Sequence, residues 1–165
     1  MKLEKASKSI LSQIDNLDQG ILTILLSDGR TTYAEIGKVL HISAGTVFVR
    51  VKKMQDLGII IGNHISVDQR KLGYDITAFL GVFLEKSSMY DEVSKELKAI
   101  PEVVSAHYTT GGYSIFVKII CRDTEHLRDT LSHKLQKIKG IQRTETFISL
   151  DETIERPLNL NLENL

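Results

Sequence analysis

The spacing of apolar residues changes once along the chain, near residue 60, and this change limits the possible folds more than any other feature. Up to about Gly58 the apolar residues recur at helical spacings of three and four. From Asp75 onward, runs typical of extended strands alternate with helical ones. The segment between, Asn63–Gly73, has the pattern of a short strand followed by a polar connector. We therefore expect two small domains joined by a hinge.

The 165 residues are enough for two such domains. We expect four segments: a domain with an N-terminal extension at 1–62, a strand and hinge at 63–74, a second domain at 75–150 and a tail at 151–165. Residues 1–63 carry 8 Lys+Arg and 6 Asp+Glu, whereas residues 64–165 carry 13 and 15, so the formal net charge is zero. Any nucleic-acid binding must therefore come from a local patch.

The single cysteine excludes a disulfide framework and a Cys-based zinc site, and it suits a reducing compartment. No run approaches the roughly 18 apolar residues of a membrane helix. The lysine-rich N-terminus lacks the apolar core of a secretory signal. We therefore expect a cytoplasmic protein without membrane contact.

Capping residues predict the first two helices of the N-terminal domain. Asp15 or Asn16 can cap the first helix, and Thr32 with Glu35 forms a capping box for the second, Tyr33–Leu40. The second helix is expected to bury the apolar residues Ile36, Val39 and Leu40.

A third helix follows after a tight turn. Ser43 is expected to cap this helix, and Gly58 ends it in a left-handed conformation. Gly37, within the second helix, costs roughly 1 kcal/mol relative to Ala, which indicates close contact with another helix. One face of the third helix is expected to be buried: Val47, Val51 and Met54.

This arrangement predicts a helix-turn-helix, whose last helix enters the DNA major groove. Thr46 can contact bases, and Arg50, at the border of the buried face, can reach a guanine or a phosphate. Phe48 and Val49 either contact bases and sugars or pack on a neighbouring segment. We expect double-stranded DNA to contact Thr32, Ser43, Gly45, Thr46, Phe48, Arg50, Lys52 and Lys53, of which the two lysines suit phosphates.

The C-terminal domain has the predicted order βαββαβ, that of a ferredoxin-like fold. The expected strands are Ile76–Leu84, Val103–Thr110, Tyr113–Cys121 and Ile141–Leu150. The first helix ends at Pro101 and Asp123 caps the second. Gly111 and Gly112 are expected to form a two-residue hairpin turn, because glycine tolerates positive φ at both positions.

Both faces of the first strand in this domain are apolar. Phe79 and Phe83 lie opposite the face that carries Leu80 and Val82. Helices cover only one side of a ferredoxin-like sheet, so another structure must cover the second. The simplest cover is the same sheet of a second subunit, which gives a homodimer.

The residues around the Gly-Gly turn could bind a zwitterionic ligand. Glycine N–H groups can hold a carboxylate, and Thr109 and Thr110 add hydroxyl groups. Thr144 and Thr146 share one face of the last strand, and Asp123 or Glu145 could bind an ammonium group. The alternative is that the glycines form only a turn and the threonines only favour strands.

An enzyme on this domain has little support. Cys121 fits a buried core thiol, and His126 and His133, seven residues apart, fit a solvated face better than a metal site. No Gly-rich phosphate loop is present. We expect no catalytic residues, no metal and no cofactor. A third class, a module that binds protein instead of DNA, stays open.

Two groups of motifs resemble the Lrp/AsnC family of feast/famine transcription regulators over roughly residues 15–155. The N-terminal motifs are Thr31–Gly37, Ser43–Val47, Arg50-Val51 and Gly58–Ile60. The C-terminal motifs, similar to the asparagine-responsive AsnC branch, are Ala106–Lys118 and Arg143–Thr146.

The resemblance implies an α+β protein with an all-α, winged-helix-like helix-turn-helix domain and a ferredoxin-like effector domain. It implies a cytoplasmic regulator that assembles as dimers and often as a tetramer of dimers. It also implies an amino acid bound between effector domains of neighbouring dimers, with asparagine as the first candidate and leucine or lysine as alternatives. The expected effector residues are Thr109, Thr110, Gly111, Gly112, Tyr113, Ser114, Thr144 and Thr146.

Both ends depart from the family pattern. The first 14 residues extend beyond its usual start, as a frayed end or as an extra helix that contacts the dimer partner or DNA. Near the C-terminus, Leu158, Leu160 and Leu162 alternate with asparagines, which suits either an added edge strand or a disordered tail.

Overall fold

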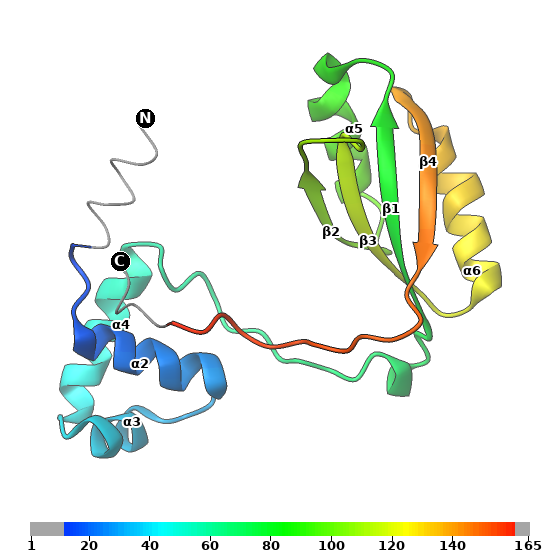
Figure 1. Ribbon diagram of the computed structural model, residues 1–165. Coiled ribbons are helices and arrows are strands. Elements are labelled where there is room, and N and C mark those ends of the chain that lie inside the picture. Colours follow the sequence, from blue (N-terminus) through cyan, green and yellow to red (C-terminus); the bar gives the residue numbers. More distant parts are fainter. Residues whose placement is uncertain (1–11, 161–165) are drawn as a thin grey trace. The chain divides into compact units, whose positions relative to one another are not determined.

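The computed structural model describes residues 12–160 and divides into two compact units between Ser66 and Val67, with residues 154–160 grouped with the first unit (Figure 1). The extra helix considered for the first 14 residues lies outside the described residues, apart from residues 12–14. Leu162 of the tail also lies outside them. Within residues 12–160, no helix combines the length and apolar character needed to span a membrane.

Within the described residues, the N-terminal unit contains three helices, and each begins at a predicted cap. They are α2 (Asn16–Ser27), α3 (Tyr33–Leu40) and α4 (Ala44–Asp56). The side chains of Thr32 and Ser43 accept hydrogen bonds from the N–H groups of Glu35 and Thr46, which confirms both predicted caps. Gly58 has a φ of 70°, as predicted for the end of α4.

The core of this unit joins all three helices. Its buried apolar residues are Ile21, Ile36, Val47, Val51 and Met54. The predicted burial of Val39 is wrong: this side chain is 63% exposed. In this helix of only two turns, Ile36 is buried and Leu40, one turn further, is partly buried against the same core, whereas Val39 lies beside this face.

Gly37 is buried because it meets the turn before α4. A Cβ atom at this position would lie 2.6 Å from the carbonyl oxygen of Ile42 and 3.4 Å from the nitrogen of Ala44. The predicted close contact is therefore present, but its main partner is turn backbone. Backbone cannot rotate away as a side chain can, so the α3–α4 turn requires glycine here.

Gly37→Ala is expected to destabilise the protein by about 1–2 kcal/mol, because overpacking against Ile42 outweighs the higher helix propensity of alanine. Thermal unfolding followed by circular dichroism measures this. Gly45→Ala is the matched control, since its nearest atom is the Ser43 hydroxyl oxygen at 3.7 Å, and its melting temperature should not fall. Equal melting temperatures for Gly37→Ala and the wild type would contradict the packing argument.

The predicted strand within 63–74 is wrong. This segment contains only a short 3-10 turn, Arg70–Leu72, and the side chains of Ile65 and Val67 are exposed. A strand needs a partner for its N–H and C=O groups, and within residues 12–160 none pairs with this segment. The tail likewise forms no strand over residues 151–160.

The C-terminal unit has the predicted βαββαβ order. Its elements are β1 (Ile76–Leu84), α5 (Tyr90–Lys98), β2 (Val103–Tyr108), β3 (Ile115–Cys121), α6 (Thr124–Asp129) and β4 (Ile141–Ile148). The sheet has the strand order β2-β3-β1-β4, and all neighbouring strands are antiparallel. This is the ferredoxin-like arrangement.

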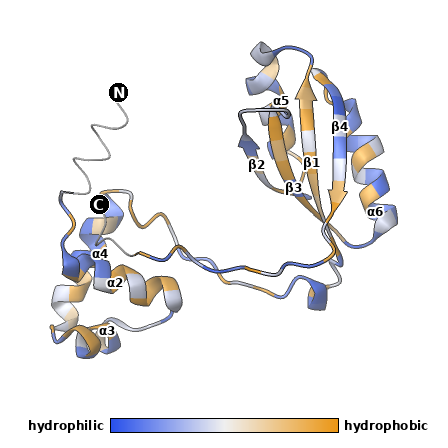
Figure 2. Ribbon diagram, in the orientation of Figure 1, coloured by the Kyte–Doolittle hydropathy of each residue, from blue (hydrophilic) through white to orange (hydrophobic). Residues whose placement is uncertain are grey.

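Helices cover one face of this sheet, and the central strands supply most of the core. In Figure 2, β1 and β3 are largely hydrophobic, whereas β2 and β4 are mixed. Leu80 of β1, Val117 of β3, Leu97 of α5 and Leu127 of α6 are buried together. Beyond α6, the helix continues through a π turn and a 3-10 turn to Lys137, an irregularity that apolar spacing did not predict.

The predicted two-residue hairpin is wrong. Tyr108 pairs with Ile115, so six residues, Thr109–Ser114, connect β2 to β3. Only one glycine of the pair, Gly111, has a positive φ, at 108°. The N–H of Ser114 donates to the carbonyl of Val82 on β1 at 2.9 Å, so the end of this loop turns toward the neighbouring strand.

A polar cluster ties the start of β2 to the second helical segment. Glu102, only 10% exposed, accepts hydrogen bonds through Oε1 from Lys134 at 2.6 Å and from His126 Nε2 at 2.9 Å. The backbone N–H of Arg122 donates to His126 Nδ1, so Nε2 carries the proton that reaches Glu102. The predicted solvated position of His126 is therefore wrong. Burial raises the pKa of Glu102, but these hydrogen bonds outweigh it and hold that pKa at about 2.

This cluster predicts a loss of stability in acid. In the unfolded chain Glu102 has a pKa of about 4.3, so between pH 4.3 and about 2 only the unfolded state binds the proton, and stability falls as the pH falls. The difference corresponds to about 3 kcal/mol at neutral pH, and solvent screening of Lys134 lowers the expected value to about 2 kcal/mol. Urea unfolding of Glu102→Gln should show this loss at pH 7 and a flatter acid limb, whereas exposed Glu125→Gln should follow the wild type. Parallel acid limbs for Glu102→Gln and wild type would contradict it.

Candidate functional site

The outward face of α4 carries one stripe of exposed residues. Gly45, Val49 and Lys52 follow at spacings of four and three, opposite the buried face. Val49 is 64% exposed. At the helix start, the hydroxyl groups of Ser43 and Thr46 lie 2.9 Å apart and both residues are exposed. Near the start of the helix this face offers small side chains that can enter a DNA groove, and further along the helix it offers the Lys52 cation.

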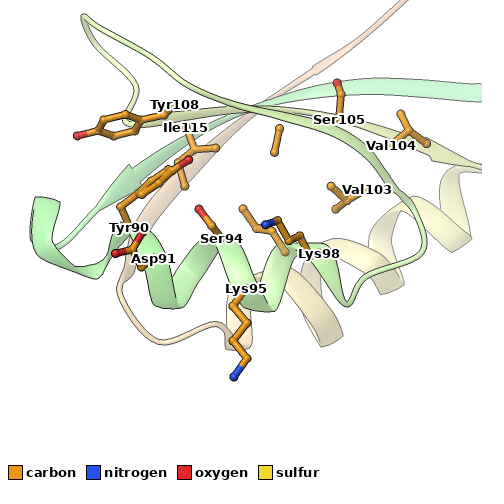
Figure 3. Close-up of a pocket in the computed structure, with 12 residues that line it drawn as sticks. Tyr90, Asp91, Ser94, Lys95, Lys98, Val103, Val104, Ser105, Tyr108 and Ile115 are labelled. Atoms are coloured by element: carbon orange, nitrogen blue, oxygen red, sulfur yellow. The ribbon is translucent and has the colours of Figure 1, made fainter. Parts of the chain in front are cut away.

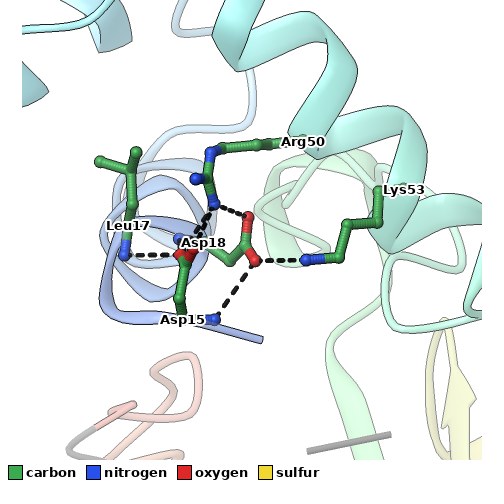
Figure 4. Close-up of polar contacts among 5 residues, drawn as sticks. All are labelled: Asp15, Leu17, Asp18, Arg50 and Lys53. Carbon is green, nitrogen blue, oxygen red and sulfur yellow. Dashed lines mark hydrogen bonds and ion pairs between the residues drawn. The ribbon is translucent and has the colours of Figure 1, made fainter. Parts of the chain in front are cut away.

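A different flank of α4 faces the start of α2 (Figure 4). The Arg50 guanidinium donates through Nη1 to both carboxylate oxygens of Asp15, at 2.8 and 2.7 Å, and to Asp18 Oδ1 at 2.8 Å. Lys53 Nζ donates to the other oxygen of Asp18 at 2.8 Å. Two cations of α4 are thus bound to two carboxylates of α2.

The two carboxylates differ in exposure. The side chain of Asp18 is fully buried, whereas that of Asp15 is 56% exposed. Burial raises the pKa of Asp18, but hydrogen bonds from Lys53 and Arg50 outweigh it, so the pKa stays below its ordinary value. The hydrogen bond from Arg50 lowers the pKa of Asp15, so both groups are charged at neutral pH.

These contacts change the interpretation of Arg50 and Lys53. Sequence reasoning treated both side chains as free to reach DNA, but the structure gives each a carboxylate partner within the unit. The missed signal was Asp18, three residues after Asp15, which completes a capping box built from two aspartates. Their roles toward DNA remain predictions.

All the other residues that are expected to contact DNA are exposed. Lys52 pairs with Asp56 at 3.0 Å, one turn along α4, an exposed contact that water screens. Phe48 is 55% exposed, with its ring centroid 6.2 Å from that of Tyr33, so it packs partly on α3. Thr32 bonds the Glu35 carboxylate in the capping box.

The second candidate site is the loop Thr109–Ser114. Gly111 and Gly112 are exposed, and a Cβ atom on either would meet nothing within 4 Å. No acceptor within residues 12–160 takes a hydrogen bond from their N–H groups. The hydroxyl of Thr109 is occupied, because it donates to the Tyr113 carbonyl at 2.8 Å. The loop therefore presents free N–H groups at its tip.

Tyr113 reaches from this loop across the sheet. Its ring lies over Gly81 of β1, so closely that any Cβ atom there would overlap it. The Tyr113 hydroxyl donates to Glu145 Oε2 at 2.8 Å, while Arg143 donates to Oε1 at 2.7 Å. Glu145, one of the two groups expected to bind an ammonium, thus already has two partners, and the hydrogen bond to it raises the pKa of Tyr113.

Thr144 and Thr146 share a face, as predicted, but it is not the face that Tyr113 covers. They pair with Val82 and Leu80, whose side chains lie on the helix-covered side of the sheet. A single protomer therefore does not bring them together with Tyr113. Asp123, the other candidate for an ammonium, caps α6 through the His126 N–H.

The uncovered face of the sheet is aromatic. The aromatic face consists of Phe79, Phe83, Tyr113, Phe116 and Phe147. Phe79 and Phe116 stack with ring centroids 5.8 Å apart, and the Arg143 guanidinium carbon lies 3.6 Å from the centroid of Phe83. Phe147 is 47% exposed and the others are partly exposed. The predicted apolar second face is thus present.

A groove of about 460 Å³ between α5 and the edge strand β2 was not predicted (Figure 3). Tyr90 and Tyr108 lie at one end with ring centroids 4.3 Å apart. Ser94 points its hydroxyl toward the strand, whereas Lys95 points away. None of the expected effector residues lines the groove, although Tyr108 directly precedes Thr109. The spacing of residues in the sequence does not predict this groove, because the groove forms where α5 packs against β2.

Two family models match the chain on either side of the break between its units. One, described as winged helix-turn-helix DNA-binding, matches residues 14–61. The other, described as Lrp/AsnC ligand binding domain, matches residues 77–158. The two matches agree with the helix-turn-helix and the ferredoxin-like unit.

Individual relatives match over nearly their whole length. Regulatory protein AsnC of Haemophilus influenzae is 46% identical over 148 residues, which cover 90% of this chain and 99% of the relative. The structure of Escherichia coli AsnC matches with a TM-score of 0.83 at 45% identity, covering 88% of this chain and 97% of that one. A transcriptional regulator of Neisseria meningitidis in complex with L-methionine shares the fold, with a TM-score of 0.86 at 22% identity, covering 90% and 98% of the chains.

Proposed function

Because the chain belongs to the Lrp/AsnC family of transcription regulators, we propose that it binds DNA through the outward face of α4 and that asparagine regulates this binding. In outline, it is a DNA-binding regulator modulated by a small amino acid. We also propose that it acts by binding alone, without catalysis, in the cytoplasm.

One observation carries the DNA part of this proposal. A complete helix-turn-helix, with capped α3 and α4, leaves Gly45, Thr46 and Val49 exposed on the helix that enters the groove. Lys52 lies one turn further, where it can contact phosphate. Arg50 and Lys53 are weaker candidates, since both already bind carboxylates.

The effector part rests on the exposed Gly111-Gly112 tip. Its free N–H groups suit the carboxylate of an amino acid, and Thr110 adds a hydroxyl group. Because one protomer does not bring Thr144 and Thr146 to this loop, we propose that they complete the site from a neighbouring subunit. Asparagine is the first candidate, on the resemblance to the AsnC branch, and leucine and lysine are the alternatives.

Thermal unfolding of the full-length protein with each standard amino acid at millimolar concentration tests the effector. A ligand at about 100 times its dissociation constant stabilises the folded state by roughly 2.7 kcal/mol, which a melting curve resolves. A shift with asparagine alone supports the proposal. A shift with another amino acid replaces the effector, and no shift with any of them contradicts amino-acid binding at this loop.

A homodimer is the assembly that the aromatic face supports. Contiguous exposed apolar surface marks an interaction site, and a second copy of the same sheet offers a complementary one. The dimer also provides two recognition helices for a pseudo-palindromic site. Dimers are proposed to assemble further into a tetramer of dimers. Sedimentation equilibrium tests both steps, and a monomer throughout the micromolar range contradicts the assembly.

A further inference from the structure

We propose that Asp15 is an internal competitor of DNA phosphate for Arg50. In the free protein the Asp15 carboxylate is paired with the Arg50 guanidinium. When the protein binds DNA, a phosphate replaces the Asp15 carboxylate at Arg50, while Asp18 holds Arg50 in position. This inference rests on the proposed DNA binding by α4, and it assigns Asp15 a role in setting DNA affinity.

The hydrogen bonds of Arg50 are concentrated on one nitrogen. Nη1 contacts three carboxylate oxygens, two from Asp15 and one from Asp18, at 2.7 to 2.8 Å. An Nη1 group has only two hydrogens, so three acceptors compete for them. Nε and Nη2 have no acceptor among residues 12–160, and the side chain is 25% exposed. Arg50 therefore has donors left for a further anion.

The two aspartates differ in how easily they can be exchanged. Asp15 is 56% exposed, and ion pairs at this exposure are weak because water screens them. Asp18 is fully buried, and separating a buried carboxylate from its cation leaves a charge without compensation. Lys53 also binds Asp18. An incoming phosphate is thus expected to displace Asp15 and to leave Asp18 in place.

Asp15 has a second role that the exchange leaves intact. Its Oδ1 caps α2 by accepting the N–H groups of Leu17 and Asp18, at 3.0 and 2.9 Å. These bonds do not depend on Arg50. Asparagine caps a helix about as well as aspartate, so the charge of Asp15 can be removed while the cap is kept.

Arg50 lies beside the proposed DNA-binding stripe. Thr46, Arg50 and Lys53 follow at spacings of four and three, which places them along one flank of α4, next to the Gly45–Val49–Lys52 stripe. A phosphate that approaches this flank meets the free donors of Arg50 and the exposed carboxylate of Asp15 together. The carboxylate both occupies the cation and repels the phosphate.

The test is a double-mutant cycle on DNA affinity with full-length protein and a short duplex of random sequence, since phosphate contacts do not depend on sequence. Asp15→Asn is expected to tighten binding about fivefold at low salt, with at most a small fall in melting temperature from the lost ion pair. In the Arg50→Gln background the same change should have less than a twofold effect. Asp28→Asn, at the other end of α2, controls for the loss of one negative charge and should also change affinity less than twofold.

Unchanged affinity of Asp15→Asn overturns the inference, and so does the same gain with and without Arg50. If Arg50→Gln does not fold, Arg50→Lys replaces it, because lysine keeps a cation beside Asp18 but lacks the spare Nε and Nη2 donors. If Asp15→Asn gives its full gain in DNA affinity in the Arg50→Lys background, the inference is also overturned. Failure of the wild type to bind any duplex would instead refute the proposed function, so the two failures are distinguishable.

Discussion

Val49→Glu is expected to abolish DNA binding while leaving the fold intact. Val49 is 64% exposed at the centre of the outward stripe of α4, so the fold gains nothing from its valine side chain. On DNA, a carboxylate at this position faces phosphates or base edges, and a like-charge contact at an interface costs several kcal/mol. We expect an affinity loss of about 100-fold or more, measured by fluorescence anisotropy with labelled duplex.

Val39→Glu provides the matched control for this change. Val39 has the same side chain and is 63% exposed, but it lies on α3. Both variants add one negative charge to the same unit, so general electrostatic effects are equal. Val39→Glu should keep most of the affinity, and equal losses in the two variants would mean that α4 is not the contacting helix.

The second large effect is expected at the effector loop. Gly112→Val should abolish the asparagine-dependent melting shift while DNA binding without asparagine stays unchanged. Gly112 has no positive φ and open space at its Cβ position, so valine fits without a clash. Its branched side chain would instead cover the N–H groups that are proposed to hold the carboxylate. Gly111 is a poorer choice, because its φ of 108° strains any other residue.

Two variants make this experiment specific. Gly62→Val changes another exposed glycine without positive φ, outside the loop, and should keep the full shift. Ser94→Trp fills the groove between α5 and β2 and should also keep it. A shift that survives in Gly112→Val and disappears in Ser94→Trp would move the ligand from the loop into the groove.

Much of the fold follows from local sequence signals. Thr32 with Glu35 and Ser43 fixed the starts of α3 and α4, because a side chain that caps an N–H group acts over only three residues. The run of apolar residues over Ile76–Leu84 predicted β1, and because successive side chains of a strand point to opposite faces, it also predicted two apolar faces. Such signals depend on residues that are neighbours in the chain, so they can be recognised without the structure.

The features that sequence reasoning missed depend on distant partners. Arg50 and Asp15 are 35 positions apart, and nothing in the spacing of α4 shows that its cation has a carboxylate partner. The Gly-Gly pair suggested a tight turn, but Tyr113 lies over Gly81 and the loop follows it across the sheet. The expected strand within 63–74 had a suitable pattern but no pairing strand among the residues described.

Selection of genomic DNA tests the central claim most directly. Fragments of the source genome are bound to the full-length protein at about 0.15 M salt, with and without millimolar asparagine, and the retained fragments are sequenced. A ligand-responsive regulator should retain a small set that shares a pseudo-palindromic motif, and asparagine should change its recovery. Recovery in proportion to genome coverage, identical with and without asparagine, would contradict the account.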